Sequence, residues 1–251
     1  MPLISDILTL LLAAYTVLVE PFLRTNFYRN LKKSLTKDTS ARLLFYRTQV
    51  LWEWSWVVLI IIIFIPRPEP LLQLGITVPG LLGWIIMVGL LLGVALSTWL
   101  IRRSPGALQN MQRSLESSAV LLPSTSQERK WFAIAAITAG ICEELLYRGF
   151  LLNFLAITFP GLDFLLASII SGIVYGLSHA YMGGRGILQN SLNGFSFAVV
   201  YFLSGNLLSV VSSTQPVGIV GSLIPAMVFH TLAELRTLFL WQPEPLKKKS
   251  R

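Results

Sequence analysis

The sequence predicts an all-α protein, a polytopic bundle of about seven to eight transmembrane helices. Of its 251 residues, 54% are hydrophobic and only 13% are charged, about half the charged share of ordinary soluble domains. The mean hydropathy is +0.67. The apolar run 81–101 alone reaches the roughly 20 residues that a helix needs to cross a bilayer core.

Seven predicted spans account for the apolar segments in chain order. The first begins close to Met1 without a preceding basic segment, so we expect a retained helix rather than a cleaved signal peptide. The segment 206–216 would give an eighth span if it enters the membrane. We place the seven at 3–22, 49–66, 79–101, 131–158, 162–180, 188–204 and 217–241.

Basic residues predict which ends of the spans face the cytoplasm. They gather from Arg24 to Arg47, from Arg102 to Lys130, and in the tail 246–251. In membrane proteins such loops lie on the cytoplasmic side. These loops account for the net charge of +8, so we expect the lipid bilayer as a partner and no nucleic acid. A short chain of this kind suits a bacterial inner (plasma) membrane.

The chain divides into three parts of different chemistry. Residues 1–130 form an N-terminal three-span membrane region with basic cytoplasmic loops, and its spans carry few ionisable groups. Residues 131–241 contain the last four spans, and 242–251 form a basic cytoplasmic tail. Ionisable side chains in a membrane span face the bundle interior or a water-filled cavity. Those of the last four spans are Glu143, Glu144, Arg148, His179, His230 and Glu234.

Glu144 and Arg148 are four residues apart, so they share a helix face and can form a charge-assisted hydrogen bond. Glu143 is turned away from that face by about 100° and cannot easily use the same partner. The spacing therefore predicts an ion pair that satisfies Glu144 and Arg148 and leaves Glu143 free. A free carboxylate in an apolar site suits a general base.

Two further pairs have the same spacing, and they contain both histidines of the chain. Tyr175 precedes His179 by four residues, and His230 precedes Glu234 by four. Together Glu143, His179 and His230 can polarise a water molecule, either directly or through a divalent metal ion such as zinc, for which all three are suitable ligands. Without a metal, Glu143 and His179 would deprotonate the water and His230 would stabilise the oxyanion.

These motifs resemble those of a known family. The stretches "EELLYR" at 143–148, "YGLSH" at 175–179 and "HTLAE" at 230–234 are similar, in order and approximate separation, to the three motifs of the CPBP family (CAAX protease and bacteriocin-processing, or Abi) of intramembrane proteases. The resemblance covers about 131–241 and implies a protease core formed by the last four spans.

The resemblance also implies roles for the residues. Glu143 would activate water with the help of His179, Glu144 and Arg148 would order the site, and His230 with residue 234 would bind the oxyanion or a metal. Members have been discussed both as metalloproteases and as metal-independent glutamate proteases. The implied substrate is a peptide or protein, which can be lipidated. Prenylated CAAX tails are the best-known lipidated substrates of the family.

Two positions depart from the family pattern. Tyr175 stands where Phe is usual, and its hydroxyl could bond to His179. Glu234 stands where Asn or Asp is usual. An ionised Glu cannot donate a hydrogen bond to an oxyanion, so Glu234 favours orienting His230 or binding a metal. It also leaves open a non-proteolytic scaffold or bacteriocin-immunity protein of the same fold. A proton-coupled transporter is the other alternative, although the expected repeated halves are not seen.

Overall fold

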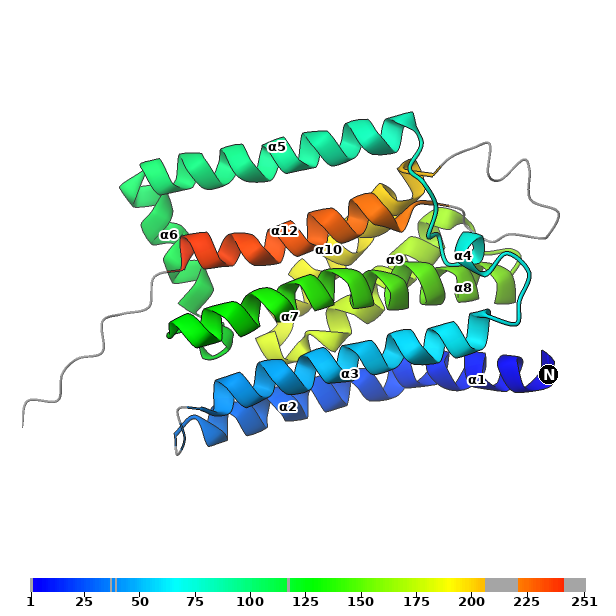
Figure 1. Ribbon diagram of the computed structural model, residues 1–251, viewed down its shortest axis with the longest axis horizontal. Helices are drawn as coiled ribbons and strands as arrows, with labels where there is room; N and C mark the ends of the chain where they lie inside the picture. Colours follow the sequence, from blue (N-terminus) through cyan, green and yellow to red (C-terminus); the bar gives the residue numbers. More distant parts are fainter. Residues whose placement is uncertain (1, 37, 39, 117, 206–220, 242–251) are drawn as a thin grey trace, which may run out of the picture.

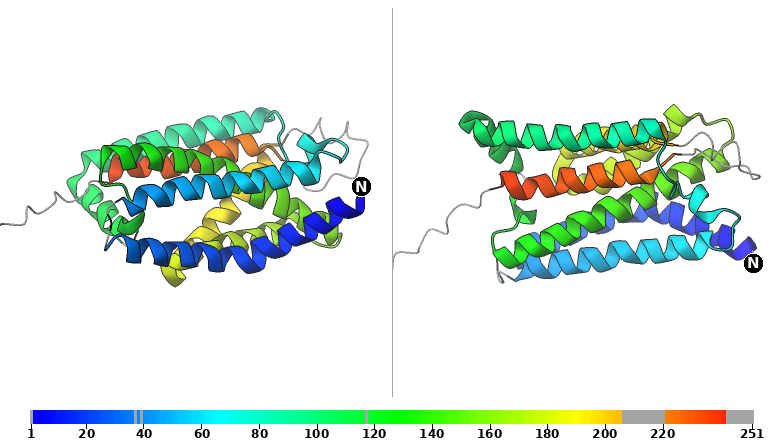
Figure 2. Two further views of the ribbon diagram at one scale, coloured as in Figure 1. Left: turned by 60° about the horizontal axis from the view of Figure 1, so that its bottom comes forward. Right: turned by 45° about the horizontal axis from the view of Figure 1, so that its top comes forward.

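The computed structural model describes residues 2–36, 38, 40–116, 118–205 and 221–241. Every regular element within these ranges is helical, which confirms the predicted fold class. Long helices run alongside one another, and further helices cross behind them (Figure 1). Two further views show the same bundle from other directions (Figure 2).

The first helix extends well beyond the predicted span. Helix α1 (Pro2–Ala14) continues through a π-helical segment, η1 (Tyr15–Val19), into α2 (Glu20–Ser34). The stretch long and apolar enough to cross a membrane is 31 residues, Ile4–Ser34. Arg24 was predicted to lie in a cytoplasmic loop, and this prediction is wrong because the helix continues past it. The helix ends ten residues later, near Lys32 and Lys33.

The next helices agree with the predicted second and third spans. Helix α3 (Ala41–Phe64) is followed by a short turn of helix, α4 (Pro70–Gln73), and then by α5 (Leu81–Arg103). Helix α5 buries none of its most apolar window inside the protein, as expected for a helix that faces lipid. The basic stretch from Arg102 to Lys130 contains α6 (Pro105–Glu116) and a 3-10 turn, η2 (Ala119–Leu121).

One continuous helix forms the centre of the bundle. It consists of α7 (Ser126–Glu144), the π-helical segment η3 (Leu145–Leu152) and α8 (Asn153–Thr158). A capping box fixes its start, because Thr125 accepts from the backbone N–H of Glu128, whose side chain accepts from that of Thr125. All eight residues of η3 are buried. Helix α7 lies between α3 and the last helix, α12 (Leu223–Leu240) (Figures 1 and 2).

Helices α9 (Phe164–Ser178) and α10 (Gly183–Leu203) fold back on each other around a short 3-10 turn, η4 (Ala180–Met182). Asp163 caps α9 by accepting from the N–H of Leu166 at 2.8 Å. Gly176 allows the two helices to approach, since a Cβ there would lie 2.5 Å from the carbonyl oxygen of Ile187. Gly140 similarly allows α7 to approach α12, where a Cβ would lie 2.8 Å from the backbone nitrogen of Thr231.

The predicted count of seven to eight spans is not confirmed. Among the described residues, four helices meet the length and hydropathy criteria for a membrane span, and the bent pair α9–α10 makes a fifth if it is one span. The central helix 126–158 is not counted, because every 18-residue window in it holds more than two charged residues. The suggested eighth span at 206–216 lies outside the described residues.

Candidate active site

The predicted ion pair on the central helix is present and fully buried. Glu144 ends α7 and Arg148 lies in η3, and neither side chain is exposed. The Arg148 Nη1 donates to Glu144 Oε1 at 2.9 Å, which confirms the pairing inferred from their spacing. A π-helical segment replaces regular α-helix directly after the two glutamates, and such segments are frequent at functional sites.

Arg148 also joins the central helix to α9 and α10. Its Nη2 donates to the carbonyl oxygen of Gly194 at 2.8 Å. The guanidinium carbon lies 4.9 Å from the ring centre of Tyr175 and 5.1 Å from that of Phe197, within the range of cation–π attraction. The contacts of Arg148 are therefore those of a residue that holds three helices together.

His230 is oriented by Glu144. Its Nδ1 lies 2.8 Å from Glu144 Oε1, and an ionised carboxylate only accepts, so this nitrogen carries a proton. Its Nε2 lies 3.8 Å from Glu143 Oε2 and 3.4 Å from the hydroxyl of Tyr175. Helix α12 thus presents one histidine nitrogen to each of the two adjacent glutamates.

His179 is held by the backbone at the C-terminal end of α9. Its Nδ1 donates to the carbonyl oxygen of Tyr175 at 2.9 Å. We assign the tautomer from this bond, because a carbonyl oxygen cannot donate. In the neutral ring Nε2 is then the unprotonated nitrogen. The bond suggested between the Tyr175 hydroxyl and His179 is not the one observed, since that hydroxyl contacts His230 instead.

Glu143 is not free, contrary to the prediction. Its side chain is 4% exposed, and its Oε1 lies 2.7 Å from Nη1 of Arg24. Arg24 comes from α2, more than a hundred residues earlier in the chain. The spacing argument considered only partners on the same helix and therefore missed this one. Glu143 Oε2 is the oxygen that faces His230.

Arg24 in turn contacts two more buried carboxylates. Its Nε lies 2.9 Å from Glu20 Oε1, and its Nη2 lies 3.7 Å from Glu53 Oε1. Tyr147, inside the "EELLYR" motif, donates its hydroxyl to Glu20 Oε2 at 2.8 Å. Sequence reasoning missed these residues, although Glu20 and Arg24 have the same four-residue spacing, and Glu53 lies inside the predicted second span.

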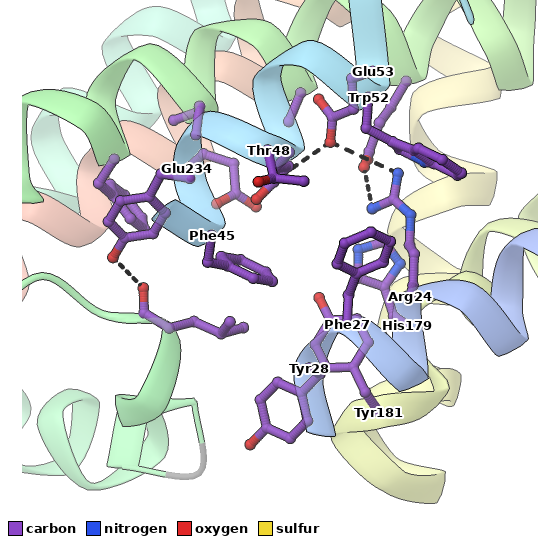
Figure 3. Close-up of a pocket in the computed structure, with 18 of the residues that line it drawn as sticks. Arg24, Phe27, Tyr28, Phe45, Thr48, Trp52, Glu53, His179, Tyr181 and Glu234 are labelled. Carbon is purple, nitrogen blue, oxygen red and sulfur yellow. Dashed lines mark hydrogen bonds and ion pairs between the residues drawn. The ribbon is translucent and has the colours of Figure 1, made fainter. Parts of the chain in front are cut away.

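A cavity of about 140 Å³ connects these groups. Glu143, His179, His230 and Glu234 line it, whereas Glu144 and Arg148 do not. Figure 3 shows Arg24 and His179 on one side of the cavity and Glu234 on the other. Helices α2 and α3 contribute much of the wall, so the N-terminal spans take part in the site. Their lining side chains include Arg24, Phe27, Tyr28, Phe45, Gln49, Trp52 and Glu53.

Glu234 reaches the cavity but does not orient His230. No hydrogen bond or ion pair joins the two side chains among the residues that the structure describes. Glu144 provides that orienting contact. The carboxylate of Glu234 is therefore available to a ligand in the cavity.

The three residues predicted to bind a metal do not fit a metal site as they are arranged. The cationic guanidinium of Arg24 contacts Glu143 and disfavours a second cation beside that carboxylate. Within the described parts of the chain, no group of three or more His, Cys, Asp or Glu side chains is placed to hold a metal ion. A divalent metal bound by Glu143, His179 and His230 stays a prediction, and no step proposed below passes through one.

The comparisons with known proteins agree with the motifs. The family model for type II CAAX prenyl endopeptidase Rce1-like proteins matches residues 125–213. The matched segment includes Glu143, Glu144, Arg148 and His179, but not His230 or Glu234. No curated protein and no solved structure matches the chain. The match confirms the resemblance to the CPBP family.

Proposed function

We propose that this chain is an intramembrane endopeptidase of the CPBP family, to which its match to the Rce1-like model points. It would hydrolyse a peptide bond in the cavity beside Glu143. The family match supports a protease of the CAAX type. The observation that carries the reaction is the set of groups that face one cavity, Glu143, His179 and His230. The cavity gives a water molecule and a peptide carbonyl a common place to meet.

The proposed water site lies between Glu143 and His230. Their facing atoms, Oε2 and Nε2, are 3.8 Å apart, too far for a direct hydrogen bond and suited to a bridging water. We assign the Glu143 carboxylate as ionised, because Arg24 contacts its other oxygen. The water would donate one hydrogen to Glu143 and the other to Nε2 of His179.

The reaction then proceeds in two steps. The water oxygen bonds to the carbonyl carbon while one water proton passes to Glu143, and the carbonyl oxygen becomes an oxyanion. When the oxyanion collapses, the carbon–nitrogen bond breaks and the proton passes from Glu143 to the leaving amine. The products are a carboxylic acid and an amine, and Glu143 returns to its ionised form.

His230 would stabilise the oxyanion. Its Nδ1 contacts the Glu144 carboxylate, and its Nε2 faces that of Glu143. We assign the ring as the doubly protonated imidazolium, whose Nε2–H can donate to the oxyanion. Glu234 cannot do so when ionised, and we assign it instead to the substrate-binding wall of the cavity.

The cavity wall supports an apolar or lipidated peptide as substrate. Phe27, Phe45, Trp52 and Phe132 line it together with three alanines of α7. Such side chains bind an isoprenoid or aliphatic chain through apolar contact. The basic ends of α2, α5 and α7 lie at the same end of the bundle (Figure 1), and we propose that this end faces the cytoplasm of a bacterial inner membrane.

A cleavage assay on the purified protein in detergent or lipid nanodiscs tests the proposal. Farnesylated and unmodified peptides of one sequence serve as substrates for the wild type and for Glu143→Gln, His179→Ala and His230→Ala. The matched control is Glu116→Gln, an exposed glutamate at the end of α6. We expect the three cavity variants to fold and to lose cleavage, and Glu116→Gln to retain it.

The assay also separates the alternatives. Cleavage by Glu143→Gln at the wild-type rate would contradict the proposed mechanism. A wild type that cleaves neither peptide would favour the hypothesis of a scaffold or immunity protein, and proton uptake by proteoliposomes would favour a transporter. Treatment with a chelator, followed by metal analysis of the same sample, distinguishes the metal-free scheme, which predicts unchanged cleavage, from a metalloprotease.

A further inference from the structure

Arg24 binds the proposed general base from outside the segment that carries the family motifs. Its Nη1 lies 2.7 Å from Glu143 Oε1, a distance typical of a charge-assisted hydrogen bond. Arg24 belongs to α2, whereas the family model begins at residue 125. The N-terminal helix therefore contributes a charge to a site whose known motifs all lie later in the chain.

The guanidinium uses a different nitrogen for each of three carboxylates. Nη1 faces Glu143, Nε faces Glu20 at 2.9 Å, and Nη2 faces Glu53 at 3.7 Å. This arrangement needs the planar fork of arginine, since a lysine ammonium is a single point charge. All three carboxylates are nearly fully buried, so each depends on a partner within the protein.

The partners of Arg24 are themselves fixed. Glu20 accepts from the hydroxyl of Tyr147 at 2.8 Å, which connects it to η3. Glu53 accepts from Gln49 Nε2 at 3.0 Å, one turn away on α3. The guanidinium is thus anchored to α3 through Glu53 and to η3 through Glu20 and Tyr147. Its direction, and with it the direction of the Glu143 carboxylate, is determined by these contacts.

We propose that Arg24 is the positioning residue for Glu143, and that α2 thereby completes the active site. Arg24 holds Oε1 of Glu143, so that Oε2 points to His230 and to the proposed water. This inference rests on the proposed function, because positioning matters only if Glu143 acts on a water. It predicts that the matched segment 125–213 alone does not make a working site.

A double-mutant cycle tests the contact without any substrate. Thermal unfolding of full-length Arg24→Ala, Glu143→Gln and the double variant, all in the same detergent, gives the coupling between the two side chains. We expect the shift in midpoint of the double variant to be clearly smaller than the sum of the single shifts. Additive shifts would overturn the proposal, whatever the protein cleaves.

Cleavage kinetics test the positioning role. Arg24→Lys keeps the positive charge but loses the planar guanidinium fork, and we expect this variant to fold. Its kcat should fall by about 10²-fold, which is the cost of a misplaced catalytic group, while its KM should stay nearly unchanged. Arg29→Ala, an exposed arginine on the same helix, is the control and should cleave like the wild type. A folded Arg24→Lys with wild-type kcat would overturn the proposal.

Chemical rescue separates positioning from general stability. In Arg24→Ala, added guanidinium ion can occupy the space left by the side chain and restore the contact with Glu143. We expect millimolar guanidinium to raise kcat of Arg24→Ala at least several-fold and to have no such effect on Arg29→Ala. If Arg24→Ala does not fold, Arg24→Lys decides alone. If the wild type cleaves nothing, the proposed function fails and the unfolding cycle still decides on the contact.

Discussion

Replacing Arg148 with methionine removes one charge from a fully buried pair while keeping most of the side-chain volume. Arg148 donates to Glu144 and to the carbonyl oxygen of Gly194. Without it, Glu144 retains His230 as its remaining partner on Oε1, and its Oε2 has no partner among the described residues. Removing one partner of a buried ion pair costs about 3–5 kcal/mol, because the buried charge that remains is less well compensated.

That free energy translates into a measurable shift. For a chain of this length, 1 kcal/mol corresponds to roughly 2–4 °C in the midpoint of thermal unfolding, so we expect Arg148→Met to lower Tm by about 6–20 °C. Thermal unfolding in a mild detergent, followed by tryptophan fluorescence or circular dichroism, measures it. Arg113→Met, an exposed position on α6, is the matched control and should change the free energy of unfolding by no more than about 0.5 kcal/mol.

The double variant Glu144→Gln/Arg148→Met separates the charge from the loss of packing. It removes both charges, so we expect it to be more stable than the sum of the two single losses indicates, with a coupling of up to about 3 kcal/mol. A Tm shift below about 2 °C for Arg148→Met would refute the argument that Arg148 compensates the buried charge of Glu144. Additive losses of stability in the two single variants and the double variant would refute it as well.

Three further substitutions test other contacts. Gly140→Val inserts a branched side chain where α7 contacts α12, and we expect a loss of about 1–3 kcal/mol or more in the free energy of unfolding; an unchanged Tm would contradict this close approach. Tyr147→Phe removes the hydroxyl that donates to Oε2 of buried Glu20 and should cost about 1–3 kcal/mol by the same measurement; an unchanged free energy of unfolding would contradict the importance of this hydrogen bond. Tyr175→Phe removes a long contact of 3.4 Å to His230, so kcat for peptide cleavage should change by less than about 10-fold, and complete inactivity would assign the hydroxyl a larger role.

The pairing of Glu144 with Arg148 could be predicted because it is local. Helix geometry places residues four apart on one face whatever surrounds the helix, and the observed distance of 2.9 Å confirms the inference. The same reasoning left Glu143 without a partner. Its partner, Arg24, is on another helix, and nothing in the spacing of one helix reveals what the neighbouring helix presents to it.

The basic residues near Arg24 also led to a wrong prediction of its position. Counting positive charges placed it in a cytoplasmic loop, as this rule commonly does for residues beside Lys32 and Lys33. A helix need not end where basic residues begin, however, and α2 continues to Ser34. The position of Arg24 within that helix turns it toward Glu20, Glu53 and Glu143 instead of toward water.

The sequence alone determined that this is an all-helical membrane protein with family motifs on its later helices, because hydropathy and helical spacing are properties of short stretches of chain. It also brought Glu143, His179 and His230 together as candidates. Which of these groups are in contact depends on the tertiary structure. The contact of Arg24 with Glu143, the choice of Glu144 as partner of His230, and the aromatic wall from α2 and α3 all depend on how helices cross and how closely they approach, and that depends on packing among residues far apart in the chain.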